Sequence, residues 1–103
     1  MRVDQGDDCY FDLAFASRTP PVDLTVAQSL VWRAKRLDNG VEVLNRDIGN
    51  GITVVDAAHA LLTLPQADTA IITTPLQYEL ELVEQSGQKS TADKGIVQPT
   101  PDL

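Results

Sequence analysis

The chain has 103 residues, 43% of them hydrophobic, and its 15 acidic and 8 basic side chains give a formal net charge of −7. A chain of this length and composition is typical of one globular domain, which argues against disorder and a membrane span. The negative field repels phosphate backbones and anionic lipids, so neither nucleic acid nor a membrane is an expected partner.

The only cysteine is Cys9, which excludes an internal disulfide, so packing and hydrogen bonds must hold the domain together. Residues 1–8 are polar and acidic and contain no apolar run of the secretory type. We therefore expect synthesis in the cytoplasm without a signal peptide.

The first predicted strand covers residues 10–16, because Phe11, Leu13 and Phe15 share one face of an extended backbone. Residues 17–21 end this strand, since their two prolines remove ladder donors.

Residues 22–25 are expected to run extended along the surface to a second strand at 29–36. In this strand Leu30, Trp32 and Ala34 face one way, which predicts a core tryptophan and not a sugar-stacking platform.

A hairpin is predicted at Asn39-Gly40, which precedes a third strand at 41–44. Type I′ turns need two residues that tolerate positive φ, and Asn-Gly is a preferred pair. The strands on either side should therefore pair antiparallel.

The middle of the chain is divided by a glycine-containing break at 49–51, a turn at 56–59 and Pro65. After 49–51 we expect a strand at 52–55, a turn at 56–59, a strand at 60–64 and one helical turn at 66–69.

The clearest strand covers 76–84, where apolar and polar side chains alternate with a period of two. We interpret it as the central strand. A polar connection at 85–88 leads to a return strand at 89–97, with Gly95 as a bulge or bend. Residues 1–98 are thus predicted to form a single domain, followed by an extended proline-containing tail at 99–103.

About seven short strands, frequent turn signals and almost no helical periodicity predict an all-β fold, an antiparallel immunoglobulin-like β-sandwich with at most one short helical turn. A barrel is the alternative. The cysteine pair of antibody domains is absent, which argues against a domain of that type.

No catalytic, cofactor-binding or metal-binding residue is assigned, and we do not expect an enzyme. His59 is the only histidine and has no nucleophile or second ligand at an informative spacing. Cys9 follows Asp7 and Asp8, whose charges oppose a thiolate nucleophile. Glu79 and Glu81 resemble a glycosidase pair but are better explained as the solvated face of a strand.

Four aspartates, Asp4, Asp7, Asp8 and Asp12, offer oxygens to calcium, but the spacing of a calcium loop is missing. A carbohydrate- or calcium-binding sandwich module remains the alternative function.

The only basic cluster is Arg33, Lys35 and Arg36. It either pairs across the sheet with Glu42 or the acidic face of 76–84, or forms a docking patch for an acidic partner.

The order of several short motifs resembles small immunoglobulin-like domains of tailed-phage and prophage structural proteins, in particular the N-terminal domain of upper-baseplate proteins. The motifs are Gln5-Gly6-Asp7, Asp23-Leu24-Thr25, the Trp32 strand, the hairpin, Ile52-Thr53, Leu62-Thr63-Leu64, Asp68-Thr69, Tyr78-Glu79-Leu80-Glu81, Ser86-Gly87 and Gly95-Ile96-Val97. The chain departs from the pattern at 75–78, where a Gly-Xaa-Tyr is usual.

This resemblance implies a non-enzymatic assembly part of a phage tail or baseplate, without a cofactor, that binds other virion proteins or itself. The edges expected to do so are 41–44 and 89–97. The chain would then be a component of the virion.

Overall fold

The computed structural model describes residues 1–15 and 22–100. The last residue of the predicted first strand, Ala16, and the break predicted at 17–21 therefore lie outside the described residues, as do the last three positions of the predicted tail. A 3-10 turn (η1) spans Leu24–Val26 and a short α-helix (α1) spans Gln66–Ala70. The strands are Arg2–Asp4 (β1), Cys9–Ala14 (β2), Ser29–Arg36 (β3), Glu42–Ile48 (β4), Gly51–Asp56 (β5), His59–Leu64 (β6), Leu76–Val83 (β7) and Lys89–Thr100 (β8).

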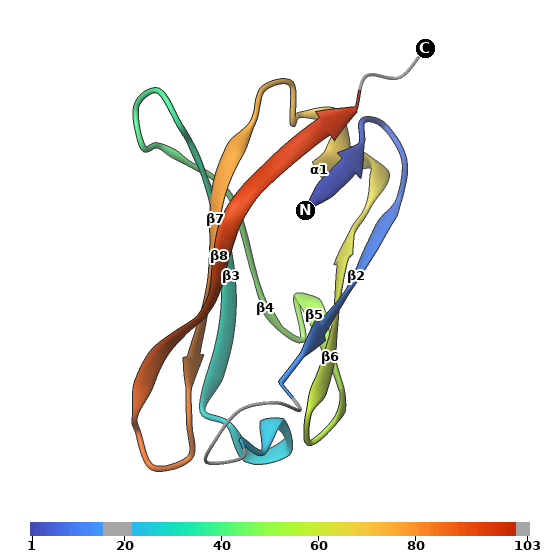
Figure 1. Ribbon diagram of the computed structural model, residues 1–103. Helices are drawn as coiled ribbons and strands as arrows, with labels where there is room; N and C mark the ends of the chain where they lie inside the picture. The colour runs from blue at the N-terminus through green and yellow to red at the C-terminus, as the bar shows by residue number, and fades with distance from the viewer. Residues whose placement is uncertain (16–21, 101–103) are drawn as a thin grey trace.

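The strands form one sheet, in the order β1-β8-β7-β3-β4-β5-β6-β2, that folds over into two layers. Figure 1 shows β3, β7 and β8 in one layer and β2, β5 and β6 in the other. Strand β4 crosses between the layers and meets β5 through only two parallel residue pairs. The other pairs are antiparallel except β1 with β8.

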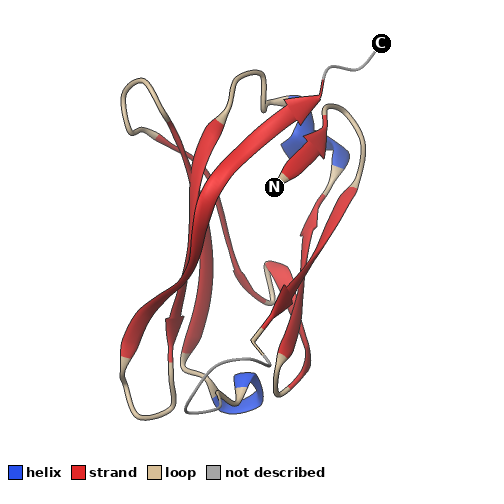
Figure 2. Cartoon of the chain, in the orientation of Figure 1, coloured by secondary structure: helices blue, strands red, loops and turns tan. Residues whose placement is uncertain are grey.

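The predicted fold class is confirmed, because the chain is an all-β, immunoglobulin-like sandwich of mainly antiparallel strands. The described residues contain eight strands where about seven were expected. They also contain two short helical segments where one was expected, and Figure 2 shows these at opposite ends of the sandwich. The end strands β1 and β2 do not pair with each other in the described residues, so the sheet does not close into a barrel.

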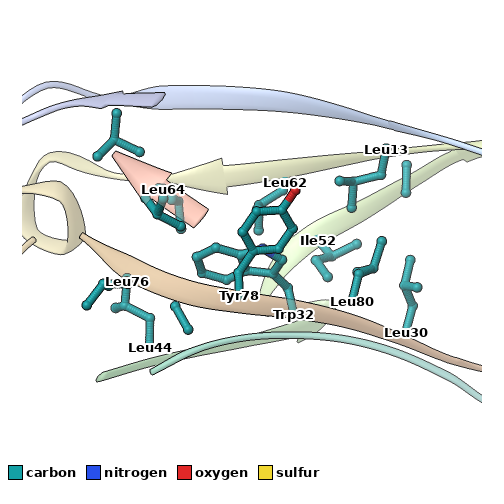
Figure 3. Close-up of a cluster of buried hydrophobic side chains, with 14 of the residues drawn as sticks. Leu13, Leu30, Trp32, Leu44, Ile52, Leu62, Leu64, Leu76, Tyr78 and Leu80 are labelled. Carbon is teal, nitrogen blue, oxygen red and sulfur yellow. The ribbon is translucent and has the colours of Figure 1, made fainter. Parts of the chain in front are cut away.

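The core lies between the layers. Trp32 is fully buried and stacks against Tyr78, with ring centroids 6.1 Å apart and planes inclined by 29°. Figure 3 shows these rings at the centre of the cluster, with Leu62 entering from β6 and Leu80 from β7. The predicted core role of Trp32 is therefore confirmed.

The two strands with the clearest alternation are also confirmed. Strand β3 has the predicted bounds, and β7 lies in the interior of the sheet between β3 and β8. Trp32 and Leu80 are register partners on the buried face, whereas Glu79 is exposed on the other face.

The hairpin prediction is right about pairing and wrong about the turn. Strands β3 and β4 are antiparallel, but only Gly40 has a positive φ, of 70°, and Asn39 does not. The connection covers 37–41, and the Gly40 N–H donates to the Arg36 carbonyl at 3.0 Å. A connection of this length closes with a single left-handed residue, so a type I′ turn is unnecessary.

The predicted bulge at Gly95 is wrong in position. The register of β8 against β7 shifts at Ala92, which has no partner, whereas Gly95 lies opposite Tyr78. A Cβ on Gly95 would come within 3.1 Å of the Tyr78 ring. The glycine therefore makes room for the tyrosine ring, and the bulge falls where the small Ala92 stands.

The ends of the chain are more ordered than expected. Val3 of β1 is fully buried, and β1 pairs in parallel with Gln98, Pro99 and Thr100 of β8. The predicted tail at 99–103 is therefore wrong for its first two residues. Neither short segment has a local partner, so the pairing forms only after the ends meet.

The connection at 22–25 is also less extended than predicted. Asp23 accepts hydrogen bonds from the Thr25 amide and hydroxyl, which starts the 3-10 turn, and Leu24 is buried. In the described part of the chain, no helix has the length and hydropathy needed to cross a membrane.

Candidate functional site

The predicted basic patch is divided between two faces of β3. Arg33 and Lys35 lie on the outer face, whereas Arg36 has the parity of the inner face. Arg36 bends to Asp38 at the strand end, with Nη2 to Oδ2 at 2.8 Å. This hydrogen bond holds the pKa of the Asp38 carboxyl below its usual range. The three side chains do not present one cationic surface.

Arg33 forms ion pairs with acidic residues on neighbouring strands, which was one of the two alternatives predicted for the basic cluster. Its guanidinium lies 3.5 Å from Glu42 of β4 and 3.7 Å from Glu81 of β7. Glu81 also lies 3.5 Å from the ammonium of Lys89 on β8. The outer face of this layer is therefore a mixed ion-pair network, and Arg33 is already engaged within it.

A separate ion pair, Arg46 with Asp68, connects β4 to α1. Nε of Arg46 donates to Asp68 Oδ2 at 3.1 Å, Nη2 donates to the same oxygen, and Nη1 donates to the Asn45 carbonyl at 2.7 Å. The side chains are only 21% and 14% exposed. This pair is structural, and its residues did not enter the sequence predictions as partners.

Two of the four aspartates considered for calcium, Asp7 and Asp8, fasten the N-terminal loop to α1. Asp8 accepts a hydrogen bond from the Gln66 amide at 2.7 Å, and the buried Thr69 hydroxyl donates to the Asp7 carbonyl at 2.7 Å. The Gly6 amide donates to Thr69 Oγ1 at 3.1 Å. Across residues 1–15 and 22–100, no three potential ligands gather as a metal site. The acidic loop is thus fastened to α1.

His59 is the first residue of β6, and the turn before it covers only 57–58 of the predicted 56–59. Its Nδ1 is 2.9 Å from Asp56 Oδ1, which also accepts the Ala58 amide. The hydrogen bond with Asp56 raises the pKa of His59. The pKa of Asp56 is lowered, mainly by the hydrogen bond from the Ala58 amide and to a smaller extent by the one with His59. Two residues joined in this way lack the nucleophile of a hydrolytic triad.

Two shallow hollows occur in the described surface. One, of about 210 Å³, is lined by Arg36, Leu37, Asp38, Thr74 and Pro75. The other, of about 250 Å³, is lined by Asp23, Val26, Glu84, Gln85 and Ser86. Both are smaller than the usual pocket for a small molecule.

Three stretches of five or more strand residues keep one side free of strand partners in the described residues. These are β2 along its whole length, β4 at 42–46 and β8 at 89–95. Two of them overlap the edges named from the sequence, 41–44 and 89–97. The third, β2, was recognised as a strand but not as an edge, because its position depends on pairing with a distant strand.

No family model and no curated protein sequence matches this chain. Among solved structures, the chain is similar to murine CRIg at 12% sequence identity, with a TM-score of 0.47 over 100% of this chain and 92% of that chain. The comparisons assign the chain to no family.

Proposed function

We propose that this protein is a non-enzymatic assembly module that works through protein–protein contacts. The observation that carries this proposal is the set of open strand edges on β2, β4 and β8. Open edges present backbone N–H and C=O groups, and partner strands use them to extend a sheet.

The arrangement of polar side chains supports a non-enzymatic role. In the described part of the chain His59 is engaged by Asp56, Trp32 is buried in the core, and neither hollow contains a histidine or cysteine. The calcium alternative gains no support from the aspartates, because Asp8 caps the start of α1. No observation favours the carbohydrate alternative.

The finer proposal is a structural component of a phage or prophage tail or baseplate. It rests on the sequence resemblance, which covers nearly the whole chain through motifs such as Asp23-Leu24-Thr25 and Asp68-Thr69. In the fold, these two motifs form the η1 cap and the α1 contact described above. An assembly part of this kind needs a stable sandwich and free edges, and no reaction centre.

The test is mass spectrometry of tail particles purified from a strain that carries the gene. We expect the chain at a fixed ratio to other tail proteins, with an abundant cytosolic protein as the control for carry-over. Intact particles without the chain would refute the phage assignment. A chain that stays monomeric with every co-expressed neighbouring protein would refute the assembly role itself.

A further inference from the structure

The free side of β2 is defined by its backbone pairing. The Phe15 amide donates to the Ala58 carbonyl at 2.7 Å, in register with the β2–β6 ladder. In an antiparallel pair, hydrogen-bonded residues recur at every second position, so the groups between them point away from the partner. The N–H and C=O groups of Tyr10, Asp12 and Ala14 therefore face outward from β6.

Strand β2 is also the least protected of these three edges. The edge of β8 carries Lys89 and Lys94 and is interrupted at Ala92, and the edge of β4 is irregular at Val43. Lysines and bulges are common devices that prevent strands from adding to an edge. Strand β2 pairs with β6 without a register shift and contains no lysine or proline.

The layer that contains β2 also has a distinct charge. No lysine or arginine occurs from Val3 to Phe15 or from Asp47 to Gln88, which include β2, β5 and β6. Asp12 is exposed near the middle of β2, and Asp7 and Asp8 are exposed just before it. A strand added at this edge would therefore meet negative charge.

Self-association through this edge is disfavoured. A symmetric pair of β2 strands centred on Asp12 would set two carboxylates opposite each other, and like charges in that position are destabilising. The net charge of −7 adds repulsion between copies.

We propose that β2 binds a basic β-strand of a partner protein, which adds to the sheet along Tyr10, Asp12 and Ala14. Backbone hydrogen bonds supply the attraction, and lysine or arginine opposite Asp12 supplies the selectivity. The exposed Tyr10 ring, 62% accessible, lies on the same face as Asp12 and can pack against the aliphatic stems of these basic side chains. This inference rests on the proposed assembly function and names the surface and partner chemistry.

The test uses a short synthetic peptide in which lysine alternates with valine, and the same peptide with glutamate in place of lysine. Binding is followed by amide chemical shifts and hydrogen exchange of the isotope-labelled protein. We expect the lysine peptide to bind about tenfold or more tightly. It should protect the amides of Tyr10, Asp12 and Ala14, and shifts spread evenly over the acidic surface would overturn the proposal.

Two variants separate backbone pairing from charge attraction. Ala14→Pro removes an outward N–H and leaves the net charge and the β2–β6 ladder intact, so it should abolish binding. Asp12→Asn should weaken binding several-fold, whereas Glu79→Gln, which removes one negative charge from the exposed face of β7 in the other layer, should not. Unchanged melting and β6 amide shifts verify that each variant is folded. Binding of the folded Ala14→Pro variant at the original affinity would overturn the proposal.

The Ala14→Pro variant also distinguishes binding at β2 from the broader assembly function. Tail particles that incorporate folded Ala14→Pro protein normally would refute the role of β2 and leave the assembly function standing. Particles that never contain the original chain would refute the phage function without bearing on peptide binding.

Discussion

The guanidinium of Arg46 on β4 and the carboxylate of Asp68 on α1 form the most buried ion pair in the described structure. Two nitrogens of Arg46 donate to one oxygen of Asp68, and a third group reaches the Asn45 carbonyl. The pair connects the strand that crosses between the layers to the helix that follows β6. It therefore secures the part of the sheet where β4 and β5 share only two residue pairs.

Arg46→Ala should destabilise the protein by about 1–3 kcal/mol, because it leaves a mostly buried carboxylate without its partner. Urea unfolding measures the effect. Arg36→Ala is the matched control, since its pair with Asp38 is largely exposed, and it should leave the unfolding midpoint nearly unchanged. Equal midpoints for the two variants would contradict a special role for Arg46.

Gly51→Ala should destabilise the fold more than Gly49→Ala. Both glycines have positive φ, at 93° and 86°, so the backbone strain of the substitution is similar. A Cβ at Gly51 would come within 2.5 Å of Arg46 Cδ, whereas Gly49 has open space around it. The difference between the two variants should be about 1–3 kcal/mol in the free energy of unfolding. A smaller loss from Gly51→Ala would show that the Arg46 side chain moves aside freely.

Thr69→Val should cost about 1–3 kcal/mol, because its buried hydroxyl serves both the Gly6 amide and the Asp7 carbonyl. Thr69→Ser keeps the hydroxyl and should recover most of the loss. Hydrogen exchange at Gly6 gives a local readout, and its rate should rise only in the valine variant. A serine variant as unstable as the valine variant would assign the effect to packing.

Leu80→Asp should unfold the domain, because it places a charge in the core against a total stability of about 5–15 kcal/mol. Glu79→Gln on the exposed face should change stability by less than about 0.5 kcal/mol. Circular dichroism and thermal melting distinguish these outcomes. Similar melting curves for the two variants would mean that the faces of β7 are reversed.

The pair of His59 and Asp56 should make stability weakly dependent on pH. The pKa of His59 is raised from 6.5, so its contribution is present below pH 6.5 and is lost as pH rises through the folded value. The pKa of Asp56 is lowered from 3.8, so its contribution is lost as pH falls below that value. The pair therefore stabilises the fold most between pH 3.8 and 6.5.

An NMR titration of the His59 ring measures this effect directly. Asp56→Asn should lower the pKa of His59 toward 6.5, and Asp12→Asn should lower it by less, since Asp12 acts only through its charge. Asp38→Asn, in the β3–β4 hairpin at the opposite end of the sandwich, serves as a remote control without effect. An unchanged His59 titration in Asp56→Asn would rule out their hydrogen bond in solution.

The strands that the sequence predicts best are those whose pattern is local. In β3 and β7 every second side chain is buried, and both strands lie between two partners, so the alternation alone defines them. Strand β1 has a single apolar residue, Val3, and exists because β8 lies beside it. Nothing in three residues indicates a partner at the other end of the chain.

For the candidate interaction edges, too, the local pattern predicts only part of the structure. The hydrophobic pattern predicts the inner face of β2 through Phe11 and Leu13, but the free edge depends on which strands become neighbours. The basic cluster failed as one surface because Arg36 lies one residue out of phase with Lys35. Arg46 and Asp68 are 22 positions apart, and only the crossing of β4 brings them together.

The parallel pair of β1 and β8 also determines how the domain responds to mechanical load. Met1 contacts Ile96 and Gln98, and Gln5 contacts Thr100, so the two strands run alongside each other in the same direction. A pull that separates Met1 from Thr100 slides β1 along β8 and loads all their hydrogen bonds in shear at once. Force applied between Met1 and Thr100 therefore loads this short pairing in its strongest orientation before it reaches the core.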